Sequence, residues 1–216
     1  MNRFRIPSLP ALVVVPLLIL CLQGCIEMAV VGAGTAVLSA NDRRTTGVQV
    51  DDESIELRAV NRVSERFGDK VHVNITSYNR GVLVTGEVPN VAAKAEIEKL
   101  IHGVPSVRGV TNDLQVVDAT SLTSRATDAT ITGKVKARLF DSGKLNPLHV
   151  KVVTEAVVVY LLGIVTEGEA NAAVEVARTT GGARKVVKIF DYCKPADAVC
   201  AAPSMPKAEE PKKSGS

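Results

Sequence analysis

The feature that most constrains this chain is an internal repeat of about 76 residues. An apolar helical face, spaced i, i+4 and i+8, occurs twice in the sequence with that shift. Its members are Ile55, Ala59 and Val63 in the first copy, and Ile131, Val135 and Leu139 in the second. A chain that repeats a pattern at this period is expected to fold as two similar units.

Each copy continues with the same order of predicted elements. Two apolar strands follow the helix, at 71–75 and 82–86 in the first copy and at 148–152 and 159–163 in the second. An Ala-rich helix comes next, at 90–102 and 168–179, and a Val-rich strand ends each copy, at 107–117 and 185–192. The sequence therefore predicts an α+β fold of two tandem αββαβ units, each a three-stranded mixed sheet with two helices packed on one face.

Turn residues and glycines support this order. Asn79 and Gly81 suit a tight hairpin between the first two strands, because such turns need positive φ angles. The second copy has Ala156 and Val157 at its turn, so we expect a strained or differently registered hairpin there. Gly86 and Gly163 end the second strands and predict a close approach of backbone, with a helix packing over the sheet as the expected cause.

The N-terminal segment has the features of an export signal. Arg3 and Arg5 precede an apolar run at residues 9–22, which is shorter than the roughly 20 residues of a membrane span. The run ends in Leu22-Gln23-Gly24-Cys25, which resembles a bacterial lipobox, in which the Cys is lipidated and becomes the new N-terminus. Ile26 rather than Asp follows, which by analogy favours the outer membrane. The alternative is a soluble secreted protein cleaved at an ordinary site.

Composition excludes several classes of function. The chain has 26 basic and 23 acidic residues, a net charge of +3, which is too balanced for a protein that binds nucleic acid through phosphates. With three His and four Cys, we expect no metal centre, no cofactor and no small-molecule substrate. His72 and His149 occupy matching repeat positions without a patterned carboxylate partner, so duplication explains them better than catalysis. We expect no enzyme.

The C-terminal region contains a second pair of cysteines. Cys193 and Cys200 lie seven residues apart, and in an oxidising compartment such a loop can close as a disulfide; two free thiols are the alternative. The expected boundaries are a signal peptide at 1–24, a lipidated Cys and flexible tether at 25–50, repeat units at 51–118 and 128–192, a linker at 119–127, and the Cys-pair loop with a disordered tail at 193–216.

Two such units, each with a Gly closing its second strand, resemble tandem BON domains. The stretches Val48-Gln49-Val50-Asp51-Asp52 and Val165-Thr166-Glu167, with Cys25 ahead of them, resemble the dual-BON outer-membrane lipoproteins. The resemblance implies phospholipid binding and a non-catalytic role in outer-membrane integrity, with the protein anchored on the periplasmic face. The second hairpin and the extra Cys pair depart from the family pattern.

The second repeat also carries a candidate membrane-binding face. On a helical wheel, an apolar strip with basic borders lies opposite the predicted core residues of the helix. The predicted phospholipid contacts are Gly133, Lys134, Lys136, Ala137, Phe140 and Lys144. An aromatic ring with flanking ammonium groups suits an anionic bilayer surface. The alternative is that Phe140 packs in the core or between the domains. The first repeat has Leu57, Asn61 and Ser64 at the positions of Gly133, Ala137 and Phe140.

Two functions follow from these features. In the first, the protein binds anionic phospholipid through its second repeat and supports the outer membrane, for example at the division site. In the second, it is a periplasmic adaptor whose domain faces bind envelope or outer-membrane assembly proteins.

Overall fold

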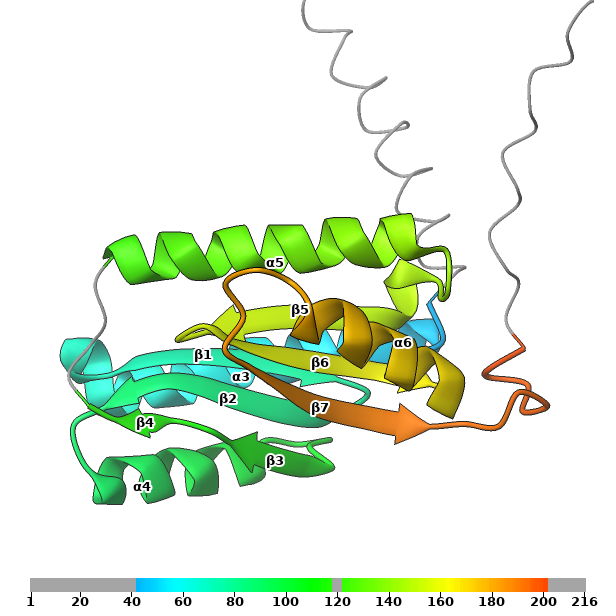
Figure 1. Ribbon diagram of the computed structural model, residues 1–216. Helices are drawn as coiled ribbons and strands as arrows, with labels where there is room; N and C mark the ends of the chain where they lie inside the picture. The colour runs from blue at the N-terminus through cyan, green and yellow to red at the C-terminus, as the bar shows by residue number, and fades with distance from the viewer. Residues whose placement is uncertain (1–41, 118–121, 202–216) are drawn as a thin grey trace, which may run out of the picture. The chain divides into compact units, whose positions relative to one another are not determined.

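The computed structural model describes residues 42–117 and 122–201 (Figure 1). The predicted signal peptide, the predicted lipidated Cys25 and most of the predicted disordered tail lie outside these residues. The first repeat contains helices α3 (Thr46–Phe67) and α4 (Val91–His102), a 3₁₀ turn η1 (Gly68–Lys70), and strands β1 (His72–Tyr78), β2 (Gly81–Val88), β3 (Gly109–Asn112) and β4 (Gln115–Val116). β1 and β2 form an antiparallel hairpin, and β3 and β4 both pair with β2 in parallel.

The second repeat has the same topology. It contains helices α5 (Leu122–Ser142) and α6 (Glu167–Arg178), a 3₁₀ turn η2 (Pro147–His149), and strands β5 (Val150–Glu155), β6 (Val158–Val165) and β7 (Lys185–Tyr192). The sheet order is β5-β6-β7, with an antiparallel hairpin and a parallel third strand. The predicted α+β fold of two repeats with mixed sheets is confirmed. The strand predicted at 107–117 is divided, because Leu114 turns into the core between β3 and β4.

Each repeat has its own apolar core between its two helices and one face of its sheet. In the first repeat, Ile55, Ala59 and Val63 of α3 pack with Val82 and Val84 of β2 and with Ile97 of α4. In the second, the predicted face of α5 packs against β6 and the small residues of α6. Those residues are Ile131, Val135, Leu139, Val159, Leu161, Ala170, Ala173 and Ala177.

The opposite faces of the two sheets share a third apolar cluster. Tyr78 and Leu83 of the first repeat are buried with Tyr160, Leu162 and Ile164 of the second. The alternation of side chains along a strand explains this arrangement, since Val82 and Val84 face the helices while Leu83 faces the other way. Each sheet is therefore covered by helices on one face and by the other repeat on the second.

Both hairpins turn through two non-glycine residues with positive φ. The angles are 52° and 64° at Asn79 and Arg80, and 48° and 57° at Ala156 and Val157. The second hairpin therefore keeps the geometry of the first, and the expected difference in register is wrong, although a β-branched residue occupies a left-handed conformation.

A buried aspartate on the first helix of each repeat stabilises these turns. The Asp52 carboxylate accepts hydrogen bonds from the backbone N–H groups of Asn79 and Arg80, at 2.8 and 2.7 Å. Asp128, 76 residues later, accepts the corresponding bonds from Ala156 and Val157, at 3.0 and 2.9 Å.

The close backbone approach predicted at Gly86 and Gly163 is present, but its predicted cause was wrong. A Cβ atom at Gly86 would collide with the carbonyl oxygen of His72, and one at Gly163 with that of His149. The first carbonyl belongs to the first residue of β1, and the second to the last residue of η2, directly before β5. The backbone at the entry to the neighbouring strand therefore causes each close approach, and not a helix packed over the sheet.

The predicted tether and linker boundaries differ from the observed elements. The side chain of Thr45 accepts a hydrogen bond from the N–H of Val48, so α3 begins at Thr46, within the stretch expected to be a flexible tether. Arg43 is buried and its guanidinium donates to the Ile164 carbonyl and to Glu169, at 2.9 and 2.7 Å. Helix α5 begins at Leu122, inside the expected linker.

The start of the C-terminal segment is also attached to the second repeat. Cys193 and Cys200 are joined as a disulfide, with Cα atoms 6.2 Å apart. The carbonyl of Cys200 accepts a hydrogen bond from Arg43 at 3.2 Å, so this loop and the segment before α3 meet at one guanidinium.

Candidate functional site

The predicted membrane-binding residues all lie on the exposed side of α5 or just after it. Gly133, Lys134, Lys136, Ala137 and Phe140 are exposed, as is Lys144 after the helix ends. Phe140 is 65% exposed, so its ring belongs neither to the core of its repeat nor to the cluster between the sheets. Helical periodicity alone brings these residues to one face, because the buried lane of Ile131, Val135 and Leu139 fixes the helix rotation.

The lysines on this face are available to an external anion. Within residues 42–117 and 122–201, the ammonium groups of Lys134, Lys136 and Lys144 make no hydrogen bond or ion pair with protein. Other basic side chains nearby are engaged: Arg138 donates to the Val176 carbonyl and to Thr180, at 3.1 and 2.8 Å. The unpaired ammonium groups therefore concentrate positive potential beside an exposed aromatic ring.

Lys136 and Phe140 also line a cavity of about 420 Å³ between α5 and β5. Its other lining residues include Arg44, Leu148 and Lys151. Arg44 and Lys151 were not predicted from the sequence, because they come from outside α5 and no periodic pattern associates them with Phe140. The cavity combines apolar walls with three cationic side chains.

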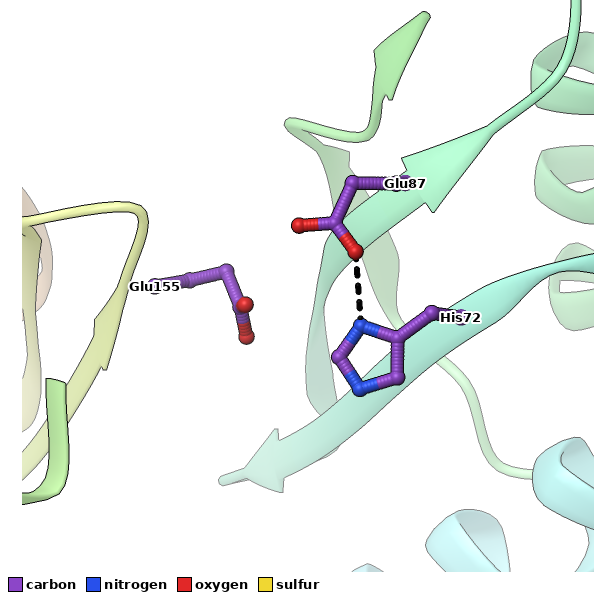
Figure 2. Close-up of side chains that lie close together, drawn as sticks. All are labelled: His72, Glu87 and Glu155. Atoms are coloured by element: carbon purple, nitrogen blue, oxygen red, sulfur yellow. Dashed lines mark hydrogen bonds and ion pairs between the residues drawn. The ribbon is translucent and has the colours of Figure 1, made fainter. Parts of the chain in front are cut away.

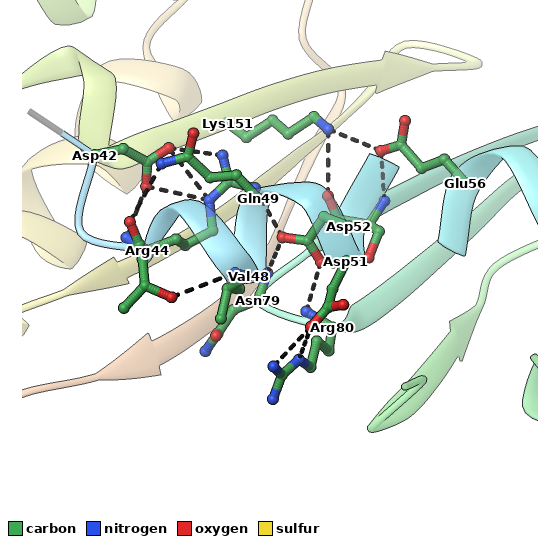
Figure 3. A network of polar contacts seen from close by, with 12 residues as sticks. Asp42, Arg44, Val48, Gln49, Asp51, Asp52, Glu56, Asn79, Arg80 and Lys151 are labelled. Carbon is green, nitrogen blue, oxygen red and sulfur yellow. Dashed lines mark hydrogen bonds and ion pairs between the residues drawn. The ribbon is translucent and has the colours of Figure 1, made fainter. Parts of the chain in front are cut away.

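Two of these cations are held by acidic partners (Figure 3). Arg44 forms ion pairs with Asp42 and Asp52, at 2.7 and 2.8 Å, and its guanidinium lies 4.2 Å from the centre of the Tyr78 ring. Lys151 pairs with Glu56 at 3.0 Å. Lys136 is thus the cation of this cavity that has no acidic partner among the described residues.

The corresponding face of the first repeat is chemically different. Leu57 and Val60 are exposed on α3, where the second repeat has Gly133 and Lys136. A larger cavity of about 910 Å³ lies between α3 and α4, with Arg62, Arg66 and Glu96 in its lining. Arg66 and Glu96 form an ion pair, and Arg62 donates to the Leu100 carbonyl at 3.2 Å. Acidic and basic side chains therefore line this cavity together.

A second cluster, His72, Glu87 and Glu155, was not anticipated from the sequence (Figure 2). His72 and Glu87 are opposite each other in the β1–β2 ladder, and their Nδ1 and Oε2 atoms are 2.8 Å apart. Glu155 comes from the end of β5 and accepts a hydrogen bond from the Asn74 side chain. The expectation that His72 has no carboxylate partner is therefore wrong.

The two carboxylates of this cluster are removed from water. Glu87 is 2% exposed and Glu155 is 6% exposed. Burial raises the pKa of the Glu155 carboxyl, and the negative charge of Glu87 raises it further, while the Asn74 hydrogen bond and His72 act in the opposite direction. Two buried carboxylates near one imidazole require a proton or a cation to balance their charge.

None of the helices in the described ranges has the length and apolar character needed to cross a membrane.

Comparison with known proteins identifies the repeats. The BON domain model matches residues 51–118 and 127–193. The chain is 39% identical to outer membrane lipoprotein DolP of Haemophilus influenzae over 79% of its own length and 90% of that protein.

Other relatives are less similar to the chain. The 21 kDa hemolysin of Actinobacillus pleuropneumoniae is 31% identical over 70% of this chain and 79% of its own. Osmotically-inducible protein Y of Escherichia coli is 28% identical over 71% and 78%, respectively. Since two matched domains account for most of the described residues, the resemblance seen in the sequence is confirmed, and the chain belongs to the BON-domain family as a tandem-BON homologue of outer-membrane lipoprotein DolP.

Proposed function

We propose that this protein is a non-catalytic outer-membrane lipoprotein that binds anionic phospholipid through α5 of its second repeat and supports outer-membrane integrity, including at the division site. The observation that carries the proposal is the exposure of Phe140 beside Lys134, Lys136 and Lys144, none of which has an acidic partner within the described ranges.

The chemistry of this face suits the boundary between headgroups and acyl chains. Burial of a Phe side chain contributes about 1.5 to 3 kcal/mol, and each Lys near an anionic surface adds about 1 kcal/mol. Gly133 and Ala137 have small side chains that project little from the helix surface between the lysines. The helix can therefore approach a headgroup layer closely. The cavity beside Phe140 offers apolar walls with Lys136 at its rim.

The cellular location is inferred from the relative that is 39% identical to this chain. That relative is an outer membrane lipoprotein, and this chain has Cys25 at the end of an apolar leader. A lipid anchor would hold the second repeat close to the membrane, so that a weak headgroup contact becomes effective at high local concentration.

The test is co-sedimentation of the chain from Ile26 to Ser216, which has no lipid anchor, with vesicles of phosphatidylcholine with and without phosphatidylglycerol. We expect binding only to the anionic vesicles. Removal of one lysine charge should weaken binding about fivefold, corresponding to about 1 kcal/mol, so Lys136→Glu should weaken it at least that much. Phe140→Ser should weaken binding to a similar or larger extent.

The repeat supplies a matched control. Arg58 occupies the position of Lys134, so Arg58→Glu and Lys134→Glu make the same charge change on equivalent helices. Only Lys134→Glu should weaken binding. Equal loss in both variants would indicate a general charge effect, and binding that is independent of phosphatidylglycerol or unchanged in Phe140→Ser would favour the adaptor function, in which the domains bind envelope or outer-membrane assembly proteins.

A further inference from the structure

We infer that His72, Glu87 and Glu155 form a binding site for a divalent transition-metal ion. The site takes ligands from both BON repeats and so connects them, and zinc is the ion used to test it. The site goes beyond the proposed function, since it involves neither α5 residues nor lipid. It also replaces the expectation, drawn from the small number of His and Cys residues, that the chain has no metal centre.

The geometry is close to that of a metal site without a large rearrangement. One ligand atom from each of the three side chains lies within 4.8 Å of the other two. Ligand atoms bound at about 2.0 to 2.2 Å in a tetrahedral site are separated by about 3.3 to 3.6 Å. The present Nδ1–Oε2 distance of 2.8 Å between His72 and Glu87 would lengthen slightly, while Glu155 would move inward.

The positions of the three residues in the sheets explain why they converge. His72 is the first residue of β1 and Glu87 is its direct partner on β2, so the backbone ladder fixes the distance between them. Glu155 ends β5, where the Asp128-stabilised turn begins, and the Asn74 amide orients its carboxylate. In Figure 2 the Glu155 carboxylate points toward the other two side chains.

The donor set is chemically suitable. One imidazole nitrogen with two carboxylate oxygens matches the ligand types of zinc and related divalent ions, and three protein ligands leave a position for water. Metal binding needs an unprotonated ligand nitrogen on His72, and the ion would neutralise the two buried carboxylates. Glu155 is held by the hydrogen bond from Asn74, and this places its buried carboxylate, which belongs to the other repeat, beside the His72–Glu87 pair.

Arg125 is a nearby cation that would compete with a metal ion. It lines one cavity with His72 and Glu155 and another with His72 and Glu87, and its Nε atom is buried without a hydrogen-bond partner. Because a guanidinium near the site repels a divalent ion, removal of Arg125 should not weaken metal binding.

The test is a calorimetric zinc titration of the full protein, purified from membranes in detergent and treated with a chelator. We expect one tight zinc ion per chain and a rise in melting temperature with zinc concentration. His72→Gln, Glu87→Gln and Glu155→Gln should each weaken zinc binding at least about tenfold, the smallest loss seen even for partners outside the first coordination shell. Arg125→Gln should bind zinc as well as the unmodified protein or more tightly.

Matched controls are His102→Gln and Glu167→Gln, which remove an exposed imidazole and an exposed carboxylate elsewhere. Far-UV circular dichroism identifies any variant that fails to fold. If the substitutions at His72 or Glu87 prevent folding, Glu155→Gln, which lies at the end of a strand, still tests the site. Zinc binding that is absent, or that is equally strong in Glu155→Gln and Glu167→Gln, would overturn the inference. Neither result would affect vesicle binding, so this test and that of the proposed function fail separately.

Discussion

The carboxylate of Asp128 accepts a hydrogen bond from the backbone N–H of Val157 at 2.9 Å, and thereby holds a β-branched residue in a left-handed conformation with φ of 57°. Asp52 makes the same contact with Arg80 in the first repeat. In each repeat, the first helix thus supplies a fixed hydrogen-bond acceptor for the hairpin turn. Its hydrogen bonds stabilise a left-handed backbone conformation that a glycine would adopt without strain.

We expect Asp128→Ala to lower the free energy of unfolding by about 2 to 3 kcal/mol, because two backbone N–H groups lose a charged acceptor and the turn residues remain strained. Urea denaturation measures this change. Asp141→Ala, an exposed position on the same helix, should change stability by less than about 0.5 kcal/mol. Equal effects of the two substitutions would show that the turn does not depend on Asp128.

Gly163 should not tolerate a side chain. A Cβ atom there would overlap the carbonyl oxygen of His149, which directly precedes the neighbouring strand β5, so Gly163→Ala should destabilise the protein by at least about 1 to 3 kcal/mol. Gly168 has no atom within contact distance of such a Cβ, and Gly168→Ala should stabilise α6 or leave it unchanged. Thermal denaturation of the two variants distinguishes them, and a harmless Gly163→Ala would contradict the strand spacing.

Glu169 should make stability depend on acid pH. Burial acts to raise the pKa of its carboxyl, but the Arg43 hydrogen bond and the contacts with Thr166 outweigh it and lower the pKa from 4.5 to about 2. A lowered pKa in the folded state means that the stabilisation is complete above pH 4.5 and is lost as the pH falls toward 2.

Glu169→Gln should remove this dependence. Urea midpoints measured across that pH range should fall less steeply for Glu169→Gln than for the unmodified protein, whereas the exposed Glu175→Gln should follow the unmodified curve. Parallel curves for all three proteins would mean that the Arg43–Glu169 ion pair does not contribute.

The Cys193–Cys200 disulfide should stabilise the second repeat modestly. It closes a loop with a sequence separation of 7, for which chain entropy predicts a contribution of about 2 kcal/mol. The double variant Cys193→Ser/Cys200→Ser should lose that amount in urea denaturation, and a reductant should have no further effect on it. A reductant that leaves the unmodified protein unchanged would show that the two thiols are free.

Cys25 is predicted to be the lipid anchor. Cys25→Ala should transfer the protein from the membrane to the soluble fraction after cell lysis, because the acyl chains provide most of the attachment. Cys21→Ala, within the apolar run of the leader, is the matched control and should stay with the membranes. Retention of Cys25→Ala on membranes would show that the anchor lies elsewhere.

The parts of this fold that were predictable from sequence depend on contacts within one repeat. The spacing of Ile131, Val135 and Leu139 gives the rotation of α5, and with it the exposure of Phe140. Asp52 and Asp128 share a shift of 76 residues and could have been found by the same comparison. They were missed because a buried acid on a helix has no periodic pattern of its own.

Contacts between the repeats had no comparable signal. Glu87 faces His72 only because of the strand register, and Glu155 reaches them only because two sheets pack against each other. Neither residue has an acidic counterpart 77 positions away: Ile164 and Tyr78 stand there. Comparison of the two repeat sequences therefore identifies residues that both repeats share. It does not identify residues such as Glu87 and Glu155, which make contacts between the repeats.

Because of the apolar layer between the sheets, the two repeats are not independent structural units. Tyr78 and Leu83 are buried together with Tyr160 and Leu162. Either repeat alone would therefore expose aromatic and aliphatic side chains of one sheet face to solvent. A single copy transplanted into another protein would be prone to self-association.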